Sequence, residues 1–80
     1  MSENIFDKTL KQIIKKEIKI NVKSNSKIYD YEKWDSLGNF NILLACEKVF
    51  KVKFSSSEFN QINSFKEILR LVKKKKKTRK

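Results

Sequence analysis

The near absence of glycine and proline limits how this chain can fold more than any other feature of its sequence. The 80 residues contain no proline and a single glycine, Gly38. β-Sandwiches and barrels need many tight turns, which these two residue types favour. Hydrophobic residues make up 39% of the chain, enough for one small core. The sequence therefore predicts a single all-α domain.

The first helix is predicted from apolar residues that recur at intervals of three and four over residues 3–19. They are Ile5, Phe6, Leu10, Ile13, Ile14 and Ile18. Residues 20–34 lose this period and carry Asn and Ser, which favour turns. They also contain large apolar or aromatic side chains, namely Ile20, Val22, Ile28, Tyr29, Tyr31 and Trp34. We therefore expect a long loop that packs onto the domain.

A second helix is predicted over residues 36–50, with Asp35 as an N-cap whose carboxylate accepts from the Gly38 amide. A helical wheel places two apolar faces on it. The broad face, expected in the core, holds Ile42, Leu43, Ala45, Cys46, Val49 and Phe50. Leu37, Phe40 and Leu44 lie on the other side. Such a second stripe indicates either a partner surface or cover by a nearby loop.

Two further helix starts are predicted from serine and glutamate at capping-box spacing. Ser55 and Glu58 open a short helix with Phe59 and Ile62 as buried candidates. Ser64 and Glu67 open the last helix, whose inward-facing residues are expected to be Phe65, Ile68, Leu69 and Val72. The predicted domain covers residues 1–72 and is a small four-helix bundle with a short third helix.

The formal net charge of +11 is concentrated at the C-terminus, where residues 73–80 hold seven positive charges. The other 72 residues carry 13 Lys or Arg and 9 Asp or Glu, a net charge of +4. Mutual repulsion should fray a helix there, so we expect residues 73–80 to be a disordered basic tail. Such a tail is either simply solvated or able to bind nucleic acid or an anionic membrane.

The sequence offers little for catalysis. There is no histidine, which excludes Ser-His and Cys-His pairs, and one cysteine, Cys46, which excludes an internal disulfide and a multi-cysteine zinc site. We therefore expect no enzyme, no catalytic residue and no metal ligand, with Cys46 buried as a small apolar residue. No secretory signal or membrane span is visible, so the expected compartment is the cytoplasm.

The segment Trp34-Asp35-Ser36-Leu37-Gly38 and residues 41–50 resemble the acyl carrier protein family, as stand-alone carriers outside housekeeping fatty-acid synthesis. Residues 54–59 and 62–65 are similar to the family's third and fourth helix starts, and the resemblance covers nearly all of residues 3–72. It implies a four-helix bundle of acyl-carrier type. It also implies that a phosphopantetheinyl transferase uses coenzyme A and Mg²⁺ to attach 4′-phosphopantetheine to Ser36, beside the capping Asp35.

The arm's thiol, not Cys46, would then carry an acyl or aminoacyl group as a thioester. A monomeric carrier of this kind would present that group to loading and transfer enzymes of a fatty-acid or specialised pathway. The residues implied to dock partners are Leu37, Phe40, Asn41, Leu44, Glu47 and Lys48.

The chain departs from the family in its charge. The family's second helix is usually acidic, whereas the exposed face here offers Asn41, Glu47 and Lys48, with Asn39 nearby. We therefore expect partners with a neutral or acidic docking surface. Two alternatives stay open: a small basic helical protein that binds nucleic acid, and a carrier-like docking module that is never modified. In both, Ser36 would be an ordinary first-turn serine.

Overall fold

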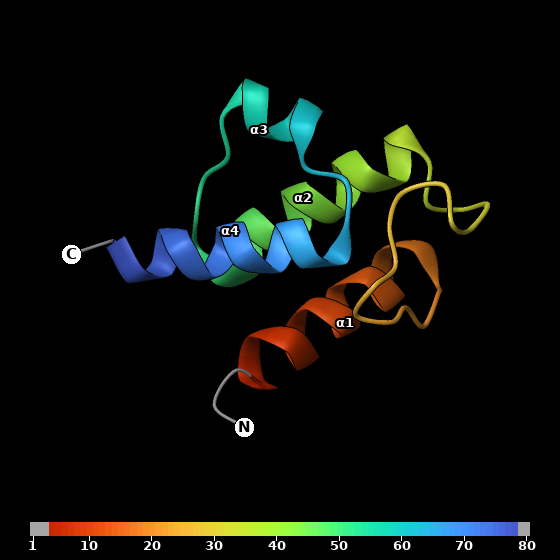
Figure 1. Ribbon diagram of the computed structural model, residues 1–80, viewed down its shortest axis with the longest axis horizontal. Helices are drawn as coiled ribbons and strands as arrows, with labels where there is room; N and C mark the ends of the chain where they lie inside the picture. The colour runs from red at the N-terminus through yellow and green to blue at the C-terminus, as the bar shows by residue number, and fades with distance from the viewer. Residues whose placement is uncertain (1–3, 79–80) are drawn as a thin grey trace.

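This computed structural model describes residues 4–78, which contain four helices joined by loops and no strand (Figure 1). The helices are α1 (Asn4–Ile18), α2 (Ser36–Phe50), α3 (Ser56–Gln61) and α4 (Phe65–Thr78). In Figure 1, α2 and α4 run in the direction opposite to α1. The all-α prediction is confirmed, and α2 has the predicted bounds.

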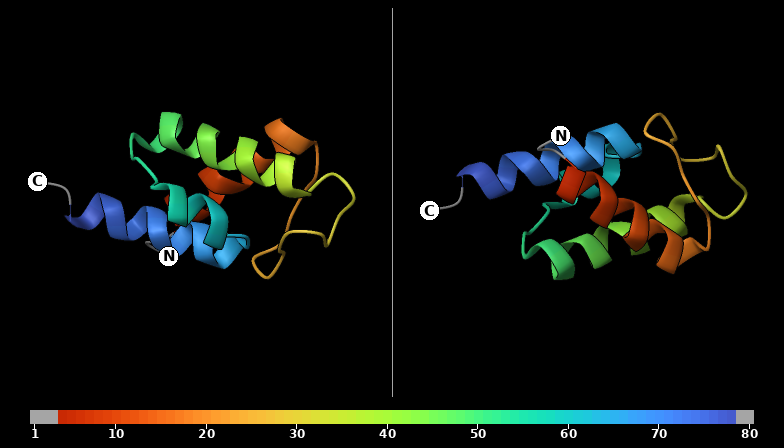
Figure 2. Two further views of the ribbon diagram at one scale, coloured as in Figure 1. Left: turned by 90° about the horizontal axis from the view of Figure 1, so that it is seen from above. Right: turned by 90° about the horizontal axis from the view of Figure 1, so that it is seen from below.

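The core lies where α1, α2 and α4 meet, as the two views in Figure 2 show. Nine side chains in it are fully buried: Leu10, Ile14, Trp34, Ile42, Leu43, Cys46, Phe65, Ile68 and Val72. Burying a side chain of this size contributes about 1.5–3 kcal/mol relative to leaving it exposed. The apolar periodicity of the three long helices therefore predicted most of the core correctly, and Cys46 is buried as expected. Ile5, which the same periodicity places on the apolar face of α1, is 66% exposed.

Val49 is the exception on α2. It was predicted to face the core, but 51% of its surface is exposed, and Ala45 beside it is only half-buried. Both residues line a groove between α1 and α2, which leaves their side chains partly exposed. A helical wheel gives the direction of a side chain, not the distance to the neighbouring helix, so it could not separate Val49 from Ile42.

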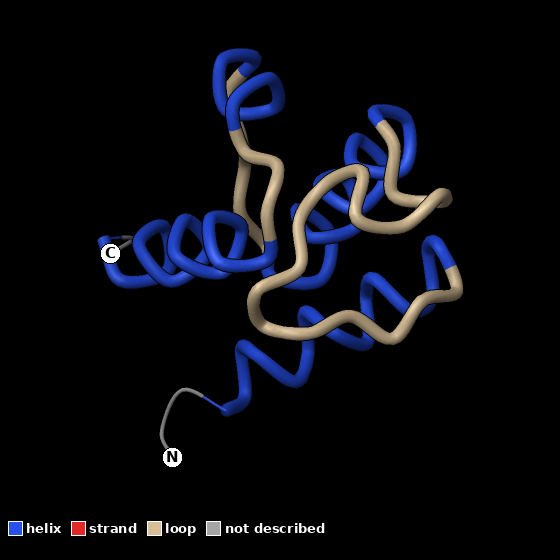
Figure 3. The backbone as a smooth tube through the Cα atoms, turned by 45° about the vertical axis from the view of Figure 1, so that its right-hand side comes forward, coloured by secondary structure: helices blue, strands red, loops and turns tan. Residues whose placement is uncertain are grey.

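The loop of residues 19–35 packs along the domain, as Figure 3 shows. It pairs with the connection between α3 and α4. The Ile28 amide donates to the Asn63 carbonyl oxygen at 2.8 Å, and the Phe65 amide donates to the Ser26 carbonyl oxygen at 2.9 Å. The predicted packing is confirmed by buried Val22 and Trp34. It is wrong for Tyr29, of which 69% is exposed.

Asn39 joins three segments from inside the protein. Trp34 Nε1 donates to Asn39 Oδ1 at 3.0 Å, and Asn39 Nδ2 donates to the Ile62 carbonyl oxygen at 2.8 Å. The asparagine is only 5% exposed. The expectation that Asn39 lies near the exposed face of α2 is therefore wrong. Its side chain is polar, but it points inward because two buried polar groups need partners there.

Gly38 lets the loop approach α2 closely. A Cβ atom at this position would lie 2.5 Å from the Lys33 carbonyl oxygen and 3.3 Å from Ile18 Cγ2. The first contact is with backbone, which cannot move aside without shifting the loop. The single glycine of the chain thus lies where the Lys33 carbonyl oxygen contacts the first turn of α2.

The two predicted caps differ in detail. Ser55 and Glu58 form a complete capping box at the start of α3. At α4, Ser64 Oγ accepts from the Glu67 amide at 3.2 Å. The Glu67 carboxylate, however, accepts from the Asn63 amide at 3.4 Å instead of the Ser64 amide. Residue spacing predicted both helix starts. It did not predict which amide each glutamate binds, because that depends on the backbone conformation before the helix.

The last helix continues past the predicted boundary at residue 72. α4 is helical through Thr78, so most of the basic run 73–80 is helix where a disordered tail was expected; residues 79–80 lie outside the described residues. Lys75 makes two contacts that favour this helical end. Its Nζ lies 3.1 Å from Glu58 Oε1 and 5.7 Å from the centre of the Phe54 ring. They connect α4 to α3 at Glu58 and to the segment before α3 at Phe54.

Replacing Asn39 by leucine should destabilise the fold. The substitution leaves the Trp34 Nε1–H and the Ile62 carbonyl oxygen buried without a partner, at about 1–3 kcal/mol for each group. We expect the free energy of unfolding to fall by roughly 2–4 kcal/mol in urea titrations. Asn41→Leu, at an exposed position of the same helix, is the matched control and should change stability by less than about 0.5 kcal/mol. Equal effects of the two variants would contradict a structural role for the Asn39 network.

Candidate functional site

Ser36 is the exposed first residue of α2, at the end of the long loop. Asp35 caps the helix as predicted, because its Oδ1 accepts from the Gly38 amide at 2.8 Å. The Asp35 carbonyl oxygen accepts from the Asn39 amide at 2.8 Å, which closes the first turn. Ser36 Oγ therefore lies at the N-terminal end of a 15-residue helix, where the helix dipole favours a negative group.

Tyr29 is the side chain that sequence reasoning missed. Its hydroxyl lies 2.9 Å from Ser36 Oγ, within hydrogen-bond distance. The two residues are seven positions apart, and the loop between them turns back on itself. No periodicity in the sequence predicts that return. Tyr29 stands next to Ile28 in the turn from Lys27 to Asp30, and two neighbouring apolar residues indicate packing onto the domain, not a contact with Ser36.

A groove of about 350 Å³ begins at Ser36 and runs between the loop, α2 and α3. Its lining mixes apolar, aromatic and amide side chains: Ile28, Tyr29, Ser36, Asn39, Phe40, Phe59, Asn60 and Asn63. The Phe40 and Phe59 rings pack with their centres 5.1 Å apart. Phe59 was predicted to be buried; it is half-buried because one side of its ring lines this groove.

Leu37, Phe40 and Leu44 form an exposed apolar stripe along α2, which we call the docking stripe. Their exposed fractions are 67%, 46% and 40%. The sequence left open whether a loop covers them, and in the described residues 4–78 none does. Three large apolar side chains at the surface, spaced along one helix face, are typical of surfaces that contact other proteins.

Glu47 is engaged within the fold. Its Oε2 accepts from the Phe54 amide at 2.7 Å, and its carbonyl oxygen accepts from the Val52 amide at 3.2 Å. Glu47 thus holds the turn that follows α2. Asn41 and Lys48, the other polar residues expected at the docking surface, are exposed. The docking stripe is therefore bordered by a neutral amide and a cation.

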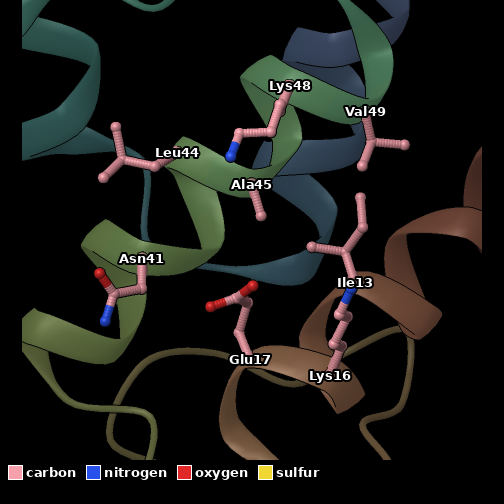
Figure 4. A pocket seen from close by; sticks show the side chains of 8 residues that line it. All are labelled: Ile13, Lys16, Glu17, Asn41, Leu44, Ala45, Lys48 and Val49. Atoms are coloured by element: carbon pink, nitrogen blue, oxygen red, sulfur yellow. The ribbon is translucent and has the colours of Figure 1, made fainter.

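A second groove, of about 310 Å³, lies between α1 and α2 (Figure 4). Ile13 and Ala45 provide apolar surface in it, and Lys16, Glu17 and Lys48 supply charges around them. Leu44 lies at its edge and so belongs to both this groove and the docking stripe. Ser36 does not line it. The groove at Ser36 is lined by the loop, α2, α3 and the segment after α3 instead.

Comparisons with protein families, with curated proteins and with solved structures found no match to this chain. Among the described residues, no helix is both long and apolar enough to cross a membrane. No group of three or more His, Cys, Asp or Glu side chains in residues 4–78 is placed to hold a metal ion.

Cys46 should make stability depend on alkaline pH. Burial, and next the nearby Glu47 charge, raises the pKa of its thiol from 9.0 to about 12. Below pH 9.0 the thiol is protonated in both folded and unfolded chains, so its contribution is constant. Above that pH only the unfolded chain ionises, and the free energy of unfolding should fall by about 1.4 kcal/mol per pH unit.

Urea titrations of the natural chain and Cys46→Ala at increasing pH test this dependence. The variant keeps all the lysines and so controls for their titration. The stability difference between the two chains should change only above the thiol's ordinary pKa. A constant difference across that range would show that the thiol ionises equally in the folded and unfolded chains.

Proposed function

We propose that this chain is an acyl carrier protein that holds an acyl or aminoacyl group as a thioester on 4′-phosphopantetheine attached to Ser36. One observation carries the proposal: an exposed serine opens α2, and an exposed apolar stripe starts at the very next residue. An acceptor that a second enzyme must reach needs both a free hydroxyl and a surface for that enzyme.

The arrangement of the helices supports this assignment. A long first helix, a long packed loop, a second helix that starts at the serine, a short third helix and a fourth follow in the order of an acyl-carrier bundle. The loop is held at Trp34 and at the α3–α4 connection, which fixes the position of Ser36. A fixed attachment point suits a carrier whose arm must reach several enzymes in turn.

The modification itself would need a separate transferase. The bond between Ser36 Oγ and the phosphorus forms, the pyrophosphate bond of coenzyme A breaks, and adenosine 3′,5′-bisphosphate leaves. The hydroxyl proton passes to a base of the transferase, because the chain has no histidine to accept it. The phosphodiester would lie at the positive end of the α2 dipole. The arm's own thiol would carry the acyl group, since Cys46 is fully buried.

Partner enzymes would meet an apolar surface bordered by a neutral amide and a cation. Leu37, Phe40 and Leu44 are exposed, Lys48 lies beside them, and the Glu47 carboxylate is committed to the Phe54 amide. A partner with acidic or neutral residues around an apolar patch complements this surface best. The proposed docking residues are thus Leu37, Phe40, Asn41, Leu44 and Lys48, with Glu47 supporting them.

The nucleic-acid alternative receives less support. Binding of single strands combines cations with exposed aromatic rings on which bases stack. In the described residues the large exposed aromatic side chains are Tyr29 and Phe40, both beside Ser36. The basic end of α4 lies at the opposite side of the molecule (Figure 1). The lysine run of α4 and these two exposed rings therefore do not share one surface.

Intact-mass spectrometry tests the carrier assignment. After incubation with coenzyme A, Mg²⁺ and a broad-specificity phosphopantetheinyl transferase, the chain should gain the mass of one phosphopantetheine. Ser36→Ala should gain none. Ser56→Ala is the matched control, because Ser56 is the exposed first residue of α3, and this variant should be modified fully. A natural chain that gains no mass would contradict the proposal and favour an unmodified docking module.

The charge of the docking surface is tested by adding acidic residues to it. With a transferase whose own docking surface is basic, Asn41→Glu combined with Lys48→Glu should raise kcat/KM for modification by about tenfold at low salt. The gain should shrink as salt increases. Gln12→Glu combined with Lys15→Glu makes the same charge change at exposed positions of α1 and should have little effect. Equal gains in kcat/KM from the two double variants would show that the net charge of the chain matters, and would contradict docking at this face of α2.

A further inference from the structure

Tyr29 is held in an unusual backbone conformation beside Ser36. Its φ angle is 71°, in the left-handed region that side-chain-bearing residues seldom adopt. The Tyr29 amide donates to the Trp34 carbonyl oxygen at 2.7 Å. The Asp30 carboxylate accepts from the Lys27 amide at 2.9 Å, and that bond holds the pKa of Asp30 below its usual range. The turn that carries Tyr29 is thus fixed on both sides.

Apolar burial does not explain why the tyrosine ring lies where it does. With 69% of its surface exposed, Tyr29 gains little from the hydrophobic effect. Its polar contact is the one at 2.9 Å to Ser36 Oγ. Tyr31 provides the contrast in the same loop. It is half-buried against the core, and its hydroxyl lies 3.3 Å from Ser26 Oγ.

We propose that Tyr29 is a positioning residue of the Ser36 site and that its hydroxyl binds the phosphodiester once Ser36 is modified. This inference rests on the proposed function. In the unmodified chain either hydroxyl can donate to the other. Modification removes the proton of Ser36 Oγ and places negatively charged phosphate oxygens next to it. Tyr29 then becomes the donor of a charge-assisted hydrogen bond, which is stronger than one between two hydroxyls.

As a consequence, the phosphodiester on Ser36 would have one preferred orientation. A phosphodiester held by Tyr29 is drawn toward the loop and toward the groove that Tyr29, Ile28 and Phe59 line. The docking stripe on α2 is then left free for a partner enzyme. Without the Tyr29 hydroxyl, the phosphodiester still lies at the N-terminal end of α2 but has no preferred orientation toward the loop.

A thermodynamic cycle of modification and Tyr29→Phe measures the contact. Stability is determined by urea titration for unmodified and modified forms of the natural chain and the variant. Modification should lower the unfolding equilibrium constant about tenfold more in the natural chain than in Tyr29→Phe, as expected for one exposed charge-assisted hydrogen bond. Any general effect of the substitution on folding cancels in this comparison. The ³¹P resonance of the modified chain should also move in Tyr29→Phe.

Tyr31→Phe is the matched control, because it removes the same atom from the same loop. Its cycle should show no coupling, and its ³¹P resonance should stay at the natural position. If the natural chain takes no phosphopantetheine, the proposed function fails and the role of Tyr29 fails with it. If modification proceeds but Tyr29→Phe shows neither coupling nor a changed resonance, only the role of Tyr29 is overturned.

Discussion

The pair of hydrogen bonds made by Asn39 is the contact on which the rest of the structure depends. One side chain links the loop before α2, α2 itself and the end of α3, and it does so inside the protein. Without that link the loop would have no buried anchor near Ser36 apart from the Trp34 ring. An amide is well suited to this place, because it offers a donor and an acceptor at once.

The close approach of the Lys33 carbonyl oxygen to Gly38 adds a steric requirement to the hydrogen bonds of Asn39. The loop can approach α2 only because residue 38 has no side chain. The first turn of α2 therefore has two neighbouring special residues: Gly38, which has no side chain, and Asn39, whose polar side chain points inward. Together they place the exposed Ser36 at a defined distance from the loop, and hence from Tyr29. The geometry of the site is a property of the loop-to-helix junction, not of α2 alone.

Sequence reasoning predicted those features that follow from local rules. The bounds of α2, the Asp35 cap and the buried faces of α1 and α4 depend on periodicity and capping, which are read along the chain. The inward turn of Asn39, the exposure of Val49 and the contact between Tyr29 and Ser36 depend on where distant segments meet. At the helical end of α4, Lys75 likewise contacts Glu58, a residue far away in the sequence. No local pattern contains that information.

Trp34 gives the protein an optical reporter of its own site. It is the single tryptophan, it is fully buried, its indole N–H donates to Asn39, and Ser36 follows two residues later. Indole emission depends on the polarity around the ring, so release of the loop from α2 would change it even while α1 and α4 stay packed. Movements of the loop at Ser36 can therefore be followed by fluorescence in the natural chain, without a label.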